Sequence, residues 1–330
     1  MSIDLKTREI KPLRHTYTHV ARLIGGDKPA TRYQETLGAQ PAANFHYRPT
    51  WDPEHDLFDP SRSKIRMDQW DDLRDPRQFY YATWTMARAR QFEAVESNFA
   101  FVESHGMLAA LPEKIREEAL AVLTPLRHVA WGDNMNNSQI CATAYGAAFT
   151  APAMLYAMDQ LGIAQLLTRF ALTLGEAAEL ERGRDAWLRD PTWQPLRRLL
   201  EDSFVITDPL ELFVVQDVAL DGLLYPLIYE GFVQDKLVPA GGAAVGLLTA
   251  FMSEWHEETV RWIDAVLRKL ASFSSENATT LSGWAEASIA RAKEALAPIA
   301  SRALGEKAPA VLGDAAESLQ RRLAKAGLSV

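Results

Sequence analysis

Apolar residues recur at helical spacing along most of the chain after residue 75. The first such stretch repeats at i, i+3, i+7 and i+10, one face of a helix that ends near Gly106 (Phe92, Val95, Phe99 and Val102). Asp75 followed by Pro76 suits the start of this region, because aspartate caps helices and proline is tolerated in a first turn. No segment alternates apolar and polar residues as a strand does. The pattern predicts an all-α fold.

Further helices are predicted along the rest of the chain, and several are long. The loop "VPAGG" at 238–242 separates two of them. Long helices favour a ferritin-like bundle with a single core over a globin-like packing of short ones. The predicted helices cover about 112–122, 126–161 with a kink at Pro152, 163–183, a segment after the break at 189–193, 210–224, 243–270, 281–299 and 311–323.

The first seventy residues follow no helical or strand period. Six prolines, at 12, 29, 41, 49, 53 and 60, interrupt them, and aromatic residues are scattered between (Tyr33, Phe45, Tyr47, Trp51 and Phe58). Disordered segments are poor in aromatic residues, so this composition argues against simple disorder. We expect residues 1–70 to form an extended arm whose rings dock onto another surface, and residues 71–330 to form the helical domain.

Composition narrows the class of protein. The chain has 330 residues, 48% of them hydrophobic and 24% charged, with a net charge of −8 and no basic block, which disfavours nucleic-acid binding. Cys141 is the only cysteine, so no intrachain disulfide can form. The N-terminus lacks an apolar signal region, and the most apolar stretch, 204–229, contains four acidic residues, which disfavours a membrane span. A cytoplasmic protein is expected.

Candidate metal ligands lie on four of the predicted helices. Di-iron bundles use a glutamate from each of two helices and a Glu-x-x-His pair from each of two others. Along this chain a comparable order is offered by Glu93 or Glu96, then His128, then Asp217 with Asp221 one turn later, and finally His256.

Both Glu-x-x-His pairs are incomplete. The residue three before His128 is Pro125, and the residue three before His256 is Ser253. Proline has no donor side chain and serine is a poor iron ligand, so the same carboxylate is missing twice. We therefore expect no metal and no catalytic residue in this chain, and a structural role for Glu93, Glu96, Asp217 and Asp221.

Three interpretations of these residues stay open. In the first, both histidines are core residues and the buried aspartates pair with Arg88, Arg90 or Arg127. In the second, the chain is a free-standing enzyme in which the two histidines and four carboxylates hold one or two metal ions. In the third, it is a helical binding protein with an apolar pocket in its core.

Several strings resemble the β subunit of the hydroxylase of bacterial multicomponent di-iron monooxygenases, in the phenol hydroxylase branch. These are "NFHYRPTWDPEHDL" (44–57), "DPRQFYY" (75–81), "PLRH" with "MNN" (125–137), "EDSFVI" (201–206), "DGLLYPL" (221–227) and "FMSEW" with "RW" (251–262). The resemblance covers roughly residues 30–300. Subunits of toluene, alkene or methane monooxygenases are the alternatives within the same family.

The resemblance implies a function that composition could not. It implies a non-catalytic subunit with the ferritin-like fold, packed in an (αβγ)2 hydroxylase beside an α subunit that holds the di-iron centre. That assembly converts phenol to catechol with O2, using NADH through a reductase with FAD and a 2Fe-2S cluster, together with a small regulatory protein. The strings and the amide-rich segment suggest interface residues, namely Phe45, Tyr47, Trp51, Phe79, Tyr80, Met135, Asn136 and Asn137.

Overall fold

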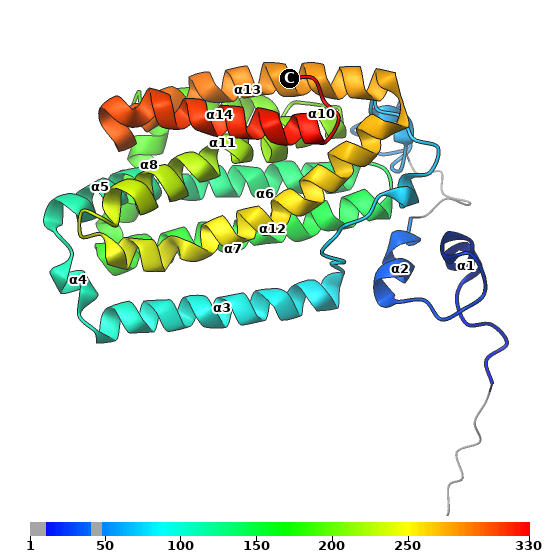
Figure 1. The fold of residues 1–330 in the computed structure, drawn as a ribbon, viewed down its shortest axis with the longest axis horizontal. Helices are drawn as coiled ribbons and strands as arrows, with labels where there is room; N and C mark the ends of the chain where they lie inside the picture. The colour runs from blue at the N-terminus through cyan, green and yellow to red at the C-terminus, as the bar shows by residue number, and fades with distance from the viewer. Residues whose placement is uncertain (1–10, 41–47) are drawn as a thin grey trace, which may run out of the picture.

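The chain folds as a helical bundle in a computed structural model that describes residues 11–40 and 48–330. Figure 1 shows long helices lying roughly along one axis, with the N-terminal segment at one end. Within the described residues 76% helix and no strand are found, so the all-α prediction is confirmed. The longer elements are α3 (Tyr81–Ser104), α5 (Glu113–Leu123), α6 (Leu126–Thr143), α7 (Ala147–Leu174), α8 (Ala177–Arg189), α9 (Gln194–Ser203), α12 (Ala243–Phe273), α13 (Ser275–Leu304) and α14 (Ala308–Lys325).

The helix predicted over 126–161 is wrong, because the chain reverses at residues 144–146. Gly146 has φ 93°, a left-handed conformation that glycine adopts readily. A Cβ there would lie 2.9 Å from the Cβ of Trp70, so space is also limited. The result is an antiparallel pair, α6 and α7, with Pro152 inside α7. The boundary predicted at 163 is likewise absent, and α7 continues to Leu174.

One continuous helix from Pro209 to Leu237 contains two π-helical segments. It consists of α10 (Pro209–Phe213), η3 (Val214–Leu220), α11 (Asp221–Tyr225) and η4 (Pro226–Leu237), of which η3 and η4 are π-helical. Asp208 caps its start by accepting hydrogen bonds from the backbone N–H groups of Leu210 and Glu211. This helix is long and apolar enough to cross a membrane, but its most apolar window is 94% buried inside the chain, as in a core helix.

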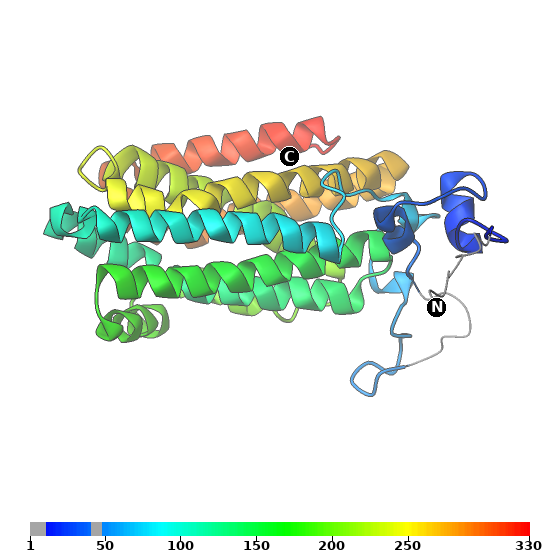
Figure 2. The ribbon, with the colours of Figure 1, turned by 90° about the horizontal axis from the view of Figure 1, so that it is seen from below.

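Four helices surround the centre of the bundle: α6, α7, the 209–237 helix and α12. α3 lies outside this set and packs on α12; Figure 1 shows it along the lower edge of the bundle, and Figure 2, seen from below, shows it in front. The four helices at the centre therefore differ in one member from the four that the sequence analysis compared with a di-iron bundle: they include α7 and not α3. α3 also begins at Tyr81 rather than near Asp75, after a turn in which Gln78 has φ 53°.

In the described part of the segment before α3, residues 11–40 and 48–80, four short helical elements occur. They are α1 (Thr18–Ile24), α2 (Arg32–Leu37), η1 (Pro60–Arg62) and η2 (Trp70–Asp72). The hydroxyl of Tyr33 accepts a hydrogen bond of 2.6 Å from the backbone N–H of Asp75, and the N–H of Gly146 donates to Gln40 Oε1 at 3.1 Å. The division into an arm at 1–70 and a domain at 71–330 stays a prediction.

Candidate functional site

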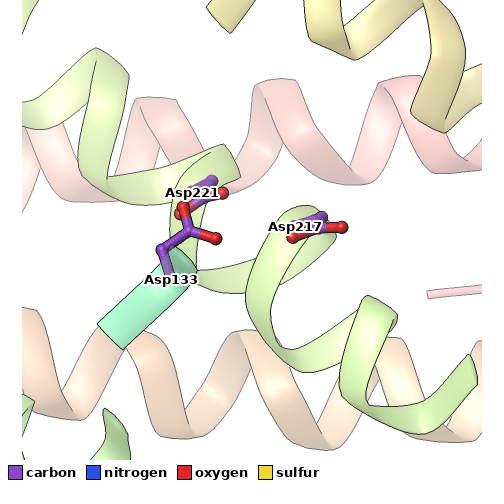
Figure 3. A group of neighbouring side chains, drawn as sticks. All are labelled: Asp133, Asp217 and Asp221. Carbon is purple, nitrogen blue, oxygen red and sulfur yellow. The ribbon is translucent and has the colours of Figure 1, made fainter. Parts of the chain in front are cut away.

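Three aspartates meet at the centre of the bundle. Asp133 comes from α6, Asp217 from η3 and Asp221 from the start of α11, and one carboxyl oxygen of each lies within 4.8 Å of the others. Figure 3 shows Asp133 and Asp221 close together, with Asp217 beside them. All three are at most 2% exposed. Three carboxyl groups thus share one small buried volume.

Neutral side chains hydrogen-bond to each carboxyl group. Nδ2 of Asn137 donates to Oδ1 of Asp133 at 2.7 Å and to Oδ1 of Asp217 at 2.8 Å. The 209–237 helix and α7 supply the donors to Asp221, which accepts from the Tyr156 hydroxyl at 2.9 Å and from Gln216 Nε2 at 3.0 Å. Gln216 can reach because a π turn brings residues i and i+5 over one another.

Among the residues that the structure describes, no basic side chain pairs with the aspartate cluster, so burial is the main influence on the pKa values of its carboxyl groups. Burial raises the pKa of Asp133 and of Asp217, and the nearby carboxyl groups raise both further. For Asp221 burial raises the pKa to about 6, while hydrogen bonds from Tyr156, Asp133 and Gln216 oppose the rise. With raised pKa values these carboxyl groups, Asp133 among them, keep their protons to higher pH than free aspartate does. Retained protons lower the negative charge of the three carboxyl groups, because close carboxylates disfavour one another's ionised form.

Neither histidine joins the aspartates. His256 is 7% exposed and stacks on Tyr225 with ring centroids 4.4 Å apart. His128 stacks on Trp187 of α8 at 5.8 Å. Burial and Arg322 lower the pKa of His256 to about 3, and burial with Arg127 and Arg184 lowers that of His128 to about 4. Both rings are therefore neutral at pH 7, packed among aromatic residues.

The predicted pairing of Asp217 and Asp221 with arginine is wrong. Arg88 binds Asp159 in a bidentate pair, with Nε to Oδ1 and Nη2 to Oδ2 both at 2.6 Å, and also contacts Glu258. Arg127 donates to the carbonyl oxygen of Leu180 instead, and Arg90 is exposed. Arg88 and Arg127 thus bind other groups. The hydrogen bonds to Asp217 and Asp221 come from amide and phenol donors instead.

The remaining predicted metal positions lie apart from the cluster. Glu93 and Glu96 are exposed on α3, where Glu96 pairs with Arg169. Pro125 precedes α6 at the start of its first turn, and Ser253 is half-buried on α12.

A di-iron centre does not fit the residues present. Iron in such bundles takes imidazole as well as carboxylate ligands, and no histidine belongs to the cluster. The amide N–H of Asn137 points at the oxygens of two aspartates, where a cation would need those oxygens free. A void of about 10 Å³ beside Asp133, Asp221 and Tyr225 is at most the size of one water molecule. This void is far smaller than a substrate-sized cavity.

The predicted interface residues divide into three groups. Phe45 and Tyr47 lie outside the described residues. Asn136 and Asn137 are fully buried and bonded within the chain, and Phe79 is 6% exposed, so these three side chains offer little surface to a partner. The remaining three side chains are at least partly exposed and could contact a partner: Trp51 (64% exposed), Met135 (37% exposed) and half-buried Tyr80.

Sequence reasoning missed Asp133 and the two donors to Asp221, Tyr156 and Gln216. A signal was present: Asp133 is one of only two charged residues between Val129 and Thr168. A carboxylate in so apolar a stretch must be buried with partners. Which partners it has depends on the reversal at Gly146, which brings α7 against α6.

Comparison with known proteins gives a consistent result. The family model for methane, phenol and alkene hydroxylases matches residues 51–272. The chain is 43% identical to the phenol 2-monooxygenase oxygenase component DmpL of Pseudomonas sp. (strain CF600), over 99% of this chain and 98% of that one. It is 24% identical to the hydroxylase component subunit beta of the toluene-4-monooxygenase system of Ectopseudomonas mendocina, over 68% and 69%. A crystal structure of xenon-pressurized phenol hydroxylase from Pseudomonas sp. OX1 superposes with a TM-score of 0.92 at 41% identity, covering 99% of both chains.

Proposed function

The chain belongs to the methane, phenol and alkene hydroxylase family, and from this premise we propose that it is the non-catalytic β subunit of a phenol hydroxylase. In this proposal it packs beside the catalytic α subunit and a γ subunit in an (αβγ)2 assembly in the cytoplasm. The identity of 43% to a phenol 2-monooxygenase component, against 24% to a toluene monooxygenase subunit, supports the phenol branch.

The observation that carries the proposal is the composition of the bundle centre. A catalytic member of this family needs carboxylates and imidazoles free to bind two iron ions. Here Asp133, Asp217 and Asp221 are bonded to Asn137, Tyr156 and Gln216, and the centre has no substrate-sized cavity. Such a centre supports a helix bundle but provides no open coordination position.

Oxygen activation and the conversion of phenol to catechol then belong to the α subunit and its di-iron centre. Electrons come from NADH through a reductase with FAD and a 2Fe-2S cluster, and a small regulatory protein completes the system. The substrate is set by the α pocket, so a toluene, alkene or methane monooxygenase subunit is the alternative within the family.

Component reconstitution tests the proposal. The chain is expressed alone and with the α and γ subunits, and phenol turnover is measured with the reductase and regulatory protein present. We expect turnover only when α is present, and unchanged turnover per assembled hydroxylase for His128→Ala and His256→Ala. Phenol oxidation by this chain without α, abolished by either substitution, would support the free-standing metal enzyme instead.

A further inference from the structure

A cleft of about 550 Å³ lies where α12 and α14 meet the 209–237 helix. Small-molecule sites usually have volumes of about 300–1,000 Å³, so the cleft can hold a ligand. Four of its lining residues come from η4, a π-helical segment, and such segments are frequent at functional sites. The cleft is distinct from the void of about 10 Å³ beside the aspartate cluster.

His256 lines this cleft from α12. Its side chain is 7% exposed, and its ring stacks on Tyr225, which fixes the plane of the imidazole. Among the residues that the structure describes, Nδ1 of His256 has no hydrogen-bond partner. Buried polar groups are rarely left unpaired, and an unbound ion or ligand is one explanation of those that are. The unpaired imidazole therefore points to a ligand in the cleft.

Arg322 of α14 brings a guanidinium group to the same place. Burial lowers the pKa of His256, and the charge of Arg322 lowers it further, so the two side chains lie near one another. Nε of Arg322 is 2.9 Å from Oδ1 of Asp264. Neither Nε nor Nη2 of Arg322 makes a hydrogen bond within the described part of the chain. A guanidinium usually binds a carboxylate through two parallel hydrogen bonds, which Asp264 does not complete.

Positive charge exceeds negative charge around Arg322. Burial raises the pKa of Asp264, while the charges of Arg322, Arg268 and Lys325 oppose the rise. One carboxylate thus faces three cationic side chains. A buried group among them with free N–H donors suits an anion and disfavours a metal ion or another cation.

Acidic side chains line the cleft as well. Glu230 and Asp235 come from η4 and Asp314 from α14. Burial raises the pKa of Glu230, and the charges of Glu257 and Asp235 raise it further. These carboxylates would repel an anion that carries more than one charge. They would accept hydrogen bonds from a hydroxyl or amino group on the same ligand.

We propose that this cleft binds a small organic monocarboxylate whose carboxylate group lies between Arg322 and His256. Nη2 of Arg322 and Nδ1 of His256 each donate a hydrogen bond to it. A hydroxyl or amino group elsewhere on the ligand donates to Glu230 or Asp235. The site uses residues outside the aspartate cluster, and the inference does not depend on the proposed function.

NMR of the full chain labelled with [13C]histidine tests the site, with sodium glycolate, a small hydroxy acid, as the probe. The ring signals of His256 and His128 are followed during the titration, and each is assigned by its loss in His256→Phe or His128→Ala. His128 is the internal control, because it is also a buried, stacked ring but does not line the cleft. Sodium chloride at the same ionic strength controls for salt.

We expect glycolate to move the His256 signal in a saturable way and to leave the His128 signal in place. Acetate, which lacks the hydroxyl group, should bind at least threefold more weakly. No movement of the His256 signal, or equal movement of both signals, would overturn the inference. Tighter binding of inorganic phosphate than of glycolate would overturn the assignment to a carboxylate.

Arginine variants test the proposed contact. Arg322→Met should weaken glycolate binding at least tenfold, whereas Arg127→Met should leave it unchanged. Arg127 is the matched control because it is a half-buried arginine with an unpaired Nε that lies outside the cleft. If circular dichroism shows that Arg322→Met has lost helix content, Arg322→Lys decides instead, since it keeps a charge beside Asp264 and should bind at least fivefold more weakly. Full affinity in a folded Arg322 variant would contradict the site.

Discussion

Two groups of buried aspartates lie in this bundle, and they are neutralised in different ways. Asp159, which is 3% exposed, is held by both nitrogens of a bidentate Arg88 and by Trp84 Nε1 at 2.9 Å. Asp133, Asp217 and Asp221 are buried as deeply but receive hydrogen bonds only from amides, a phenol and one another. The first group is an ion pair, and the second is a set of carboxyl groups that keep protons.

The pKa shifts follow this difference only on the arginine side of the ion pair. Burial raises the pKa of Asp159 as well, although the hydrogen bonds and charge of Arg88 oppose the rise. Burial alone would lower the pKa of Arg88, but the hydrogen bonds and charges of Asp159 and Glu258 outweigh it and raise the pKa, so Arg88 stays charged. In the cluster nothing outweighs burial, and the pKa values of all three aspartates rise. The carboxyl groups of the cluster are thus balanced by retained protons and neutral hydrogen-bond donors, while Asp159 has a guanidinium partner.

Removing the ion-pair partner should have the largest effect. Arg88→Met leaves Asp159 buried without a counter-charge, and we expect the free energy of unfolding to fall by about 3–5 kcal/mol. Urea denaturation of the chain measures it. Arg90→Met, which removes an exposed arginine two residues away, is the control and should leave the midpoint unchanged. Equal effects of the two substitutions would show that Arg88 is not the compensating charge.

Within the aspartate cluster, the side-chain amide of Asn137 should contribute most to stability, because it bridges Asp133 and Asp217. Asn137→Leu removes the donor that Asp133 and Asp217 share, and we expect a loss of about 2–3 kcal/mol because two buried acceptors lose a partner. The same denaturation measurement applies. Stability equal to that of the unsubstituted chain would mean that the aspartates find other donors.

The free energy of unfolding should depend on pH through the aspartate cluster. Unfolded aspartate titrates near pH 3.9, and the cluster holds its protons to higher pH, to about 6 for Asp221. The folded state therefore binds more protons than the unfolded state above pH 4, so stability falls as pH rises, by about 1.4 kcal/mol per pH unit for each such group.

Asp133→Asn isolates one of these groups. Its amide keeps the donor toward Asp221 and an acceptor for Asn137 but cannot titrate. We expect the fall in unfolding free energy between pH 4 and pH 6 to be shallower by about one proton than in the unsubstituted chain. Identical slopes would contradict the assignment of a retained proton to Asp133.

A single hydroxyl should matter less. Tyr156→Phe removes one donor to Asp221, and we expect a loss of about 1–2 kcal/mol in urea denaturation. Tyr229→Phe removes the hydroxyl of a buried tyrosine on the 209–237 helix and serves as the control. It should lower the free energy of unfolding by about 0.5 kcal/mol or less. A smaller effect at Tyr156 than at Tyr229 would argue that the hydrogen bond to Asp221 is dispensable.

Substitution of surface carboxylates should change the free energy of unfolding least. Glu96→Ala removes an exposed pair with Arg169, and we expect a change within about 0.5 kcal/mol in the same assay. Glu93→Ala, one turn earlier on α3, should behave alike. A large loss at either residue, or a change in bound metal, would return α3 to the set of ligand-bearing helices.

Local patterns predicted the fold better than they predicted the site. Helical periodicity located α5, α12 and α14 to within a few residues, because each buries one apolar face. It predicted no break at Gly146, because the residues around it are mostly small and apolar. The close approach of Trp70 to Gly146 depends on tertiary structure and is not visible in the sequence.

The candidate site was predicted only in part, for a similar reason. Asp217 and Asp221 were singled out by their place in an apolar stripe, and their burial was correctly expected. Their partners were assigned to arginine because sequence spacing says nothing about which helices meet. Asp133 lies on α6 and Tyr156 on α7, on either side of a turn that the sequence pattern did not predict. The pattern therefore did not identify these two residues as members of the site.

The most direct test of the account is the metal content of this chain itself. The assembled hydroxylase is dissociated under mild conditions, the α and β subunits are separated, and iron, manganese, magnesium and calcium are counted in each by mass spectrometry. We predict less than stoichiometric metal in this chain, and unchanged iron in the assembly when Asp133, Asp217 and Asp221 are all replaced by asparagine. One metal ion retained per chain, and lost on that replacement, would contradict the account.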